Sequence, residues 1–212
     1  MSLKIERYLS RANKLSKKGE LEKAKEIYSS VLKISPDNKV AKKQLLSLEQ
    51  NHASNPEKAQ LEEAMRLYKL GQLDEALNAV NELIQNHPSE PILFNIRGAC
   101  YSVLGPTDHA IEDFKKAISL NQNYAEAHYN LGVVFQKIDQ NDNAYDCYEN
   151  ALKLNHAYPQ AHNNIGNVLV ELGQSDMALK SYKKALKINP EYAEAHNNLG
   201  GTLKNLGQLE DA

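Results

Sequence analysis

Three histidines of this 212-residue sequence recur at one interval and are the first candidates for chemistry. His128, His162 and His196 are spaced 34 residues apart, a regularity that would suit a ladder of metal ligands. Zinc binds nitrogen at about 2.0–2.1 Å, whereas units stacked at such an interval lie roughly 10 Å apart, so neighbouring rings would not converge on one ion. We therefore expect these rings to pack between helices, and we predict no metal and no cofactor.

Catalytic motifs are absent from the sequence. It contains no glycine-rich phosphate loop, no GxSxG, no HExxH and no paired cysteine ligands. Cys100 and Cys147 lack the spacing of a redox or zinc motif, so they are expected in the core. The chain is therefore predicted not to be an enzyme.

Asparagines offer a chemistry of recognition instead. They recur at the same interval as the histidines, with further asparagines beside them; the set is Asn130, Asn164, Asn198, Asn163, Asn197 and Asn167. A carboxamide has one acceptor and two donors, so it can bond both polar groups of a peptide backbone whatever the side chain. The column predicts a surface for an extended peptide over residues 125–212. The alternative is that asparagine is simply a common polar choice on these surfaces.

Charge is unevenly distributed along the chain. The net charge of -2 combines about +6 over residues 1–56 with about -8 over residues 57–212. The basic part carries neither an aromatic platform nor an arginine-rich helix, so nucleic acid is not expected as a partner. No run approaches the ~20 apolar residues of a membrane span, and the N-terminus lacks a signal pattern. We expect no membrane association and a cytoplasmic location.

An internal repeat must position these side chains. Residues 125–132 read AEAHYNLG, residues 159–166 read PQAHNNIG and residues 193–200 read AEAHNNLG. This 34-residue frame predicts complete units at 57–90, 91–124, 125–158 and 159–192, an earlier unit at 5–38 and a truncated unit at 193–212.

Each unit is predicted to be two helices. In the unit at 159–192, the apolar spacing favours helices over 159–172 and 175–188. Ser175 is expected to cap the second helix, and Asn189 followed by proline is expected to end it. Small residues at Gly166 and Ala178 would let the two backbones approach closely, and Tyr182 would pack between them.

The repeats resemble the tetratricopeptide repeat family over about 190 residues. Leu131, Gly132, Phe135, Ala144, Tyr148 and Ala151 follow its pattern, as do the matching residues of the next unit. The resemblance implies an all-α, right-handed superhelical solenoid of antiparallel helix pairs that binds proteins or peptides on its concave face. The asparagine column resembles that of the O-GlcNAc transferase repeats. The family's cationic clamp for chaperone C-termini is a poor match, because its positions hold residues such as Leu61, Asn95 and Tyr129.

The frame slips once, near the N-terminus. Residues 39–56 fit no unit and predict an extra helix that caps the first unit, with a hinge near 51–56 and a helix beginning at Pro56. The predicted domains are therefore 1–56 and 57–212.

Three apolar residues suggest a second contact site. Phe94, Ile92 and Ile96 lie within five residues of one predicted first helix. They are not expected all to point inward, so a hydrophobic contact site is a hypothesis for this helix.

Two functions follow from the repeats. The first is a non-catalytic scaffold that binds a protein or an extended peptide. The alternative is the recognition arm of a larger enzyme, of glycosyltransferase or sulfotransferase type, with its catalytic domain beyond residue 212. Because the last repeat stops within its second helix, we also expect end-to-end self-association through residues 193–212, or fraying after about residue 200.

Overall fold

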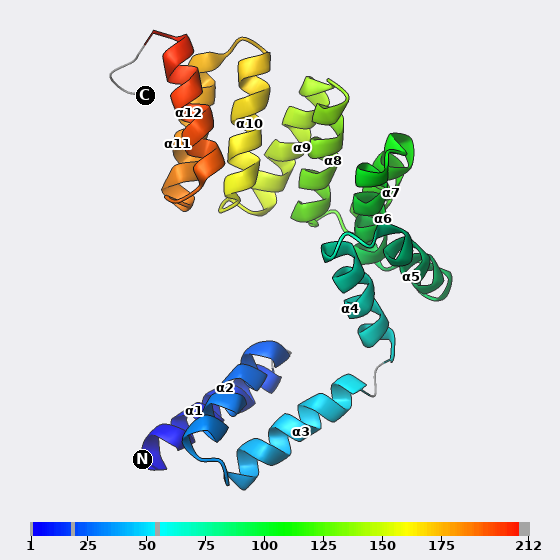
Figure 1. Ribbon diagram of the computed structural model, residues 1–212, viewed down its shortest axis with the longest axis vertical. Coiled ribbons are helices and arrows are strands. Elements are labelled where there is room, and N and C mark those ends of the chain that lie inside the picture. Colours follow the sequence, from blue (N-terminus) through cyan, green and yellow to red (C-terminus); the bar gives the residue numbers. More distant parts are fainter. Residues whose placement is uncertain (1, 18–19, 54–55, 208–212) are drawn as a thin grey trace. The chain divides into compact units, whose positions relative to one another are not determined.

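The computed structural model describes residues 2–17, 20–53 and 56–207, and these residues form twelve α-helices and no strand (Figure 1). In chain order the helices are α1 (Ser2–Lys17), α2 (Leu21–Ile34), α3 (Lys39–Ala53), α4 (Pro56–Lys69), α5 (Leu73–Asn86), α6 (Pro91–Leu104), α7 (Thr107–Leu120), α8 (Ala125–Lys137), α9 (Asn141–Leu154), α10 (Pro159–Glu171), α11 (Ser175–Ile188) and α12 (Ala193–Asn205). The predicted all-α solenoid of helix pairs is confirmed.

The chain divides into two compact units, Met1–Glu62 and Glu63–Ala212. The division falls within α4, whereas the sequence placed a boundary after residue 56. Helix α4 begins at Pro56, as predicted. Two residues of the predicted hinge at 51–56, residues 54 and 55, lie outside the described residues.

The first unit has a small core of its own. Helices α1 and α2 form a pair, and α3 packs against α2. Ala12, Tyr28 and Ala41 are fully buried in one cluster drawn from these three helices. The extra helix that the sequence predicted after the first repeat is therefore present as α3, and it contributes Ala41 to the core of that repeat.

The second unit is a row of helix pairs, α6 with α7, α8 with α9 and α10 with α11. Turns of a few residues join each pair, so its helices run antiparallel. Successive first helices (α6, α8, α10 and α12) also contact one another. Among the described residues of this unit, no comparable contact joins successive second helices (α5, α7, α9 and α11). Because the first helices lie closer together, they line the inner side of the row.

The two helices of a pair approach closely where the first helix carries glycine. A Cβ atom on Gly132 would lie 2.7 Å from Cε1 of Tyr148, and one on Gly166 would lie 2.7 Å from Cδ1 of Tyr182. Carbon atoms in ordinary contact are about 3.5–4.0 Å apart, so a larger residue does not fit there. Both tyrosine rings are buried. The predicted role of the small residues and of the second-helix tyrosines is confirmed.

In the second unit, the turn that follows each first helix contains a residue with left-handed backbone. Gly71, Gly105, Gly173 and Gly207 have φ angles of 74°, 114°, 74° and 76°. Their common interval places Asp139 at the equivalent turn after α8, with φ of 59°. Glycine adopts this conformation without steric cost, whereas the Cβ atom of Asp139 makes it unfavourable.

The ends of α11 correct one prediction. The helix begins at Ser175, and its cap residue is Gln174, whose side chain makes no capping hydrogen bond. The prediction of Ser175 as the cap is therefore wrong. The predicted stop at Asn189 is confirmed, since its backbone N–H donates to the Ala185 carbonyl at 2.9 Å. Its Oδ1 accepts from the backbone N–H of Glu191 at 3.2 Å, which closes the turn that follows.

A buried ion pair joins three helices. Arg97 of α6 donates from Nε and Nη2 to the two carboxylate oxygens of Asp113 of α7, at 2.7 Å each. Its Nη1 donates to Oδ1 of Asn81 of α5 at 3.0 Å. Asp113 is 5% exposed, so this bidentate pair lies largely out of water. It holds α6 against both neighbouring second helices.

Candidate functional site

The predicted asparagines lie on the first helices α8, α10 and α12, on the inner side of the second unit. Asn130, Asn164 and Asn198 are half-buried, and Asn197 is exposed. Asn163 is fully buried. The prediction of Asn163 as a direct peptide contact is therefore wrong, because no surface of this residue is available to a partner.

The half-buried asparagines form a hydrogen-bonded ladder across the repeats. Asn130 Nδ2 donates to Oδ1 of Asn95 at 3.1 Å, one repeat earlier. Asn198 Nδ2 donates in the same way to Oδ1 of Asn163 at 3.0 Å. Each bond joins residues 35 apart in sequence and therefore links one first helix to the next. The recurring asparagines thus stabilise the stacking of the repeats.

The middle rung of this ladder ends on a tyrosine. Asn164 Nδ2 donates to the Tyr129 hydroxyl at 3.2 Å, again one repeat earlier, and to the Tyr148 hydroxyl at 3.3 Å. The ring centroid of Tyr129 lies 5.7 Å from that of Tyr148 and 4.8 Å from that of Tyr158. Tilted aromatic pairs at these distances attract each other. The three rings hold the Tyr129 hydroxyl where the amide of α10 reaches it.

Two carboxylates fix the direction of the outer rungs. Asn95 Nδ2 donates to Glu126 Oε1 at 3.3 Å, and Asn163 Nδ2 donates to Glu194 Oε1 at 3.1 Å. An ionised carboxylate can only accept, so it binds the NH₂ end of each carboxamide. The Oδ1 atom then faces the amide of the next repeat. Sequence reasoning missed Asn95 and both glutamates. Glu126 and Glu194 lie two repeats apart, and the equivalent position between them holds Gln160, so the repeat interval did not show their role.

The side chain of Asn167 is held by the second helix of its own pair, α11. Asn167 Oδ1 accepts from the Tyr182 hydroxyl at 2.9 Å and from Asn198 Nδ2 at 3.0 Å. Burial raises the pKa of Tyr182 to about 12, so its hydroxyl keeps its proton at neutral pH. Tyr182 therefore remains a donor, and Asn167 is fixed in one orientation.

Part of the hydrogen-bonding capacity of the ladder remains available. Within the part of the chain that the structure describes, no group donates to Oδ1 of Asn130 or of Asn198. Because each carboxamide oxygen accepts up to two bonds, these atoms can accept a backbone N–H from a partner. The exposed Asn197 amide lies on the same helix as Asn198.

The surface around the ladder is acidic. Glu126 and Glu194 are exposed in addition to accepting from the asparagines. The Tyr192 hydroxyl donates to Glu194 Oε2 at 3.2 Å. Burial, together with the charge of Glu194, raises the pKa of Tyr192 to about 12. A neutral or basic segment is therefore better suited to this face than an acidic one.

Two of the three residues of the apolar contact site expected on α6 are buried. Phe94 and Ile96 are 7% and 6% exposed, and Ile92 is half-buried. Phe94 packs with Ala117 and Ala127 of the neighbouring helices, so its ring faces inward. The hypothesis of a hydrophobic contact site at these residues is therefore wrong for Phe94 and Ile96. Val133 of α8, which the sequence did not single out, is an exposed apolar residue, with 39% of its surface accessible.

The histidines make contacts that account for their spacing. His128 Nε2 lies 3.4 Å from the Gln122 carbonyl, and His196 Nε2 lies 2.8 Å from the Pro190 carbonyl. Each ring thus ties the start of a first helix to the loop six residues earlier. Across the described residues, no group of three histidine, cysteine or acidic side chains is placed to hold a metal ion.

The two cysteines are buried, as predicted, and they are poor nucleophiles. Cys100 is fully buried and Cys147 is 9% exposed. Burial raises the pKa of each thiol to about 11. Since the thiolate is the reactive form, neither residue has the lowered pKa of a catalytic cysteine.

Among the described helices, none is long and apolar enough to cross a bilayer.

Family comparisons agree with the repeat frame. Models of the tetratricopeptide repeat match residues 5–38, 125–158 and 147–180, and a TPR repeat model matches residues 101–139 and 166–207. Together these matches cover about two thirds of the chain. The unit at 5–38 and the unit at 125–158 coincide with units that the sequence predicted.

Individual proteins are similar to this chain in sequence or in fold. The Hsp70-Hsp90 organizing protein of Triticum aestivum is 28% identical over 96 residues, which are 44% of this chain and 16% of that protein. The chain thus spans a small part of that relative's length. The crystal structure of MamA is 28% identical with a TM-score of 0.63, over 70% of this chain and 86% of MamA. The Cut9-Hcn1 hetero-tetramer, at 18% identity and a TM-score of 0.70 over 92% of this chain and 42% of that one, shares the fold.

Proposed function

Because the chain belongs to the tetratricopeptide repeat family, we propose that it is a non-catalytic protein-interaction scaffold that binds an extended peptide or partner segment along α8, α10 and α12. The wheat relative is named as an organizing protein for Hsp70 and Hsp90, which is a role in protein assembly. The buried thiols, with pKa values raised to about 11, argue against a cysteine nucleophile among the described residues.

The asparagine ladder is the observation that carries this proposal. Asn130 and Asn198 have their NH₂ groups engaged within the chain and their Oδ1 atoms available at the inner face. Acceptors fixed in this way do not have to be ordered when a partner binds, which lowers the entropic cost of association. They accept a backbone N–H and are indifferent to the partner's side chains. This arrangement suits an extended segment, as the likeness to O-GlcNAc transferase repeats implies.

The ladder is tested by substitution with a matched control. Asn130→Ala, Asn164→Ala and Asn198→Ala, combined in one chain, should abolish capture of partners from the source cell extract. Asn78→Ala removes an exposed asparagine from the second helix α5 and should leave capture unchanged. Circular dichroism must show that the triple variant remains folded. Equal capture by the folded triple variant and by wild type would refute the ladder as the binding surface.

End-to-end self-association through residues 193–212 remains a prediction. Leu203 of α12 is 3% exposed, whereas Leu206 is 40% exposed, and residues 208–212 lie outside the described residues. Sedimentation velocity over a hundredfold range of concentration tests it. A constant sedimentation coefficient would contradict it.

A further inference from the structure

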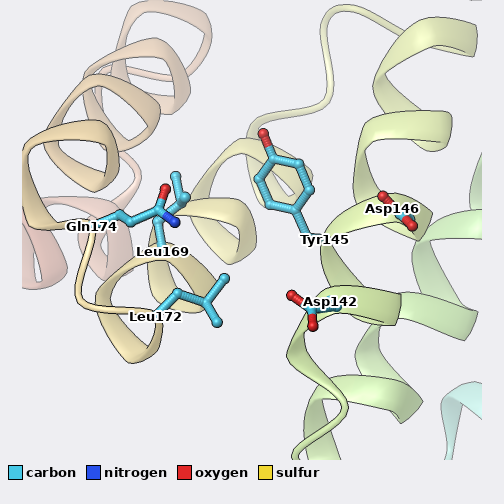
Figure 2. A pocket seen from close by; sticks show the side chains of 6 residues that line it. All are labelled: Asp142, Tyr145, Asp146, Leu169, Leu172 and Gln174. Carbon is cyan, nitrogen blue, oxygen red and sulfur yellow. The ribbon is translucent and has the colours of Figure 1, made fainter.

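A hollow separate from the asparagine ladder lies between α9 and the end of α10. It has a volume of about 310 Å³ and is lined by Asp142, Tyr145, Asp146, Leu169, Leu172 and Gln174. Figure 2 shows Asp142, Tyr145 and Asp146 of α9 on one side of this hollow, and Leu169, Leu172 and Gln174 on the other. The volume is at the small end of the range for ligand sites, about 300–1,000 Å³, which suits a single long side chain.

The two walls of the hollow differ in chemistry. Asp142 and Asp146 are four residues apart on α9, so their carboxylates project from one face of the helix. No ion pair or hydrogen bond to either carboxylate is found among the described residues. The opposite wall is apolar: Leu172 is 39% exposed, and Leu169, which is 3% exposed, lines the hollow from the core. An occupant should therefore combine positive charge with an apolar stem.

The equivalent junction one repeat earlier is already filled. Phe135 stands in the place of Leu169 there, and Lys115 of α7 places its Nζ 5.9 Å from the centre of the Phe135 ring. The chain thus supplies its own cation and its own bulky side chain at that junction. At the hollow, the residue equivalent to Lys115 is Glu149, so the internal cation is replaced by an acid.

The junction one repeat later has lost the acidic pair. Lys180 of α11 stands in the place of Asp146, while Asp176 retains the place of Asp142. An aspartate recurs at the position of Asp142 near the start of the second helices, where its negative charge interacts favourably with the helix dipole. Asp146 has no such explanation. The combination of two acids with a small apolar wall therefore belongs to the junction between α9 and α10.

We infer that this hollow is a side-chain pocket for an arginine presented by a partner protein. The guanidinium has five donors in a planar fork, so it can bond the carboxylates of Asp142 and Asp146 together and stack on the Tyr145 ring. The methylene stem packs against Leu169 and Leu172. Lysine offers a point charge without the fork or the stacking plane, so it binds more weakly in the same place.

Titration with short peptides tests the pocket directly. The probe is a blocked peptide of sequence Gly-Leu-Arg-Leu-Gly, followed by amide chemical shifts of the labelled chain. Shifts should concentrate on α9 and on residues 169–174. Replacing the arginine of the probe by lysine should weaken binding, and replacing it by glutamine should abolish it. Equal binding of the glutamine peptide would overturn the assignment.

Charge and shape are separated by matched variants. Asp142→Asn with Asp146→Asn should lower the affinity about tenfold or more, since charged hydrogen bonds are lost. Asp108→Asn with Glu112→Gln removes the same two charges one repeat earlier and should leave the affinity unchanged. Equal losses from both pairs would overturn the pocket in favour of diffuse attraction.

A second variant keeps the charges and removes the space. Leu169→Phe copies the junction at Phe135 and should block the arginine peptide in a chain that circular dichroism shows to be folded. Unchanged binding by the folded variant would overturn the pocket. Concentration-dependent self-association that the Asp142 and Asp146 changes abolish would show that the occupant is a second copy, and would overturn the assignment to a separate partner. The pocket does not depend on the asparagine ladder, so ladder variants should still bind the arginine peptide.

Discussion

Replacing Gly166 by alanine should destabilise the repeats, although alanine favours helices. A Cβ atom there would lie 2.7 Å from both Cδ1 and Cζ of Tyr182, and closer still to Cε1. The ring is 2% exposed and its hydroxyl donates to Asn167, so it cannot move aside without losing that bond. Gly201 of α12 is the matched control, because nothing lies within 4 Å of a Cβ atom built on it.

The expected changes in the free energy of unfolding have opposite signs at the two sites. At Gly166, overpacking costs about 1–3 kcal/mol and the disturbed hydrogen bond about 1 kcal/mol, while the helix propensity of alanine returns about 1 kcal/mol. The net destabilisation is about 2 kcal/mol. At Gly201, only the gain of about 0.5–1 kcal/mol applies. Gly98 should show a smaller loss than Gly166, because its Cβ atom would lie 3.0 Å from the Phe114 ring.

Urea unfolding followed by circular dichroism, with hydrogen exchange at α10 and α11, measures both changes. Repeat proteins can unfold in parts, so exchange is needed to localise the effect to this pair. Gly166→Ala should speed exchange in both helices, and Gly201→Ala should not. Combining Gly166→Ala with Tyr182→Leu should recover part of the loss, since leucine lacks the outer ring atoms. Equal stabilisation by the two alanines would refute the close-approach argument.

Three further outcomes follow from the same contacts. Asp139→Gly should stabilise the chain by about 1 kcal/mol in urea unfolding, because glycine relieves the left-handed backbone; unchanged stability would contradict that strain. Asp113→Ala should cost about 3–5 kcal/mol by leaving Arg97 partly buried without its partner, whereas a loss below 1 kcal/mol would show the pair to be dispensable. Cys100 and Cys147 should resist alkylation at pH 8, because their pKa values are raised to about 11. Because burial disfavours the thiolate in the folded state, the contribution of the thiols to the free energy of unfolding is complete below about pH 8.5 and is lost as the pH rises through 11. Alkylation of the folded chain as fast as in urea would contradict the raised pKa values.

The repeat interval predicted the fold well because local spacing determines it. Glycine and alanine recur at the 34-residue interval, and these small residues predicted two helices in close contact. Gly166 of the first helix and Tyr182 of the second meet as expected. The turn residue was also periodic, although Asp139 occupies a position that glycine holds in the other described turns. The cap at Ser175 was misplaced by one residue, because the backbone bonds at Gln174 close that turn without a side chain.

The site was predicted only in outline. Which side of a first helix a residue presents depends on the neighbouring repeat, so sequence spacing did not show that Asn163 is buried or that Phe94 faces inward. The pairing of Asn198 with Asn163 depends on the offset between adjacent helices, which the interval alone does not specify. The hollow beside Asp146 depends on the size of Leu169 in the next repeat, and only the structure brings these residues together.

Site-specific crosslinking tests whether a partner segment lies along the first helices of the second unit. A photoreactive phenylalanine analogue is placed at Val133, which is 39% exposed on α8, and separately at Leu154, which is 38% exposed on α9. Both sites tolerate a large side chain because both are on the surface. A partner bound along the first helices should crosslink from position 133 and not from position 154. Crosslinking from position 154 alone would contradict it.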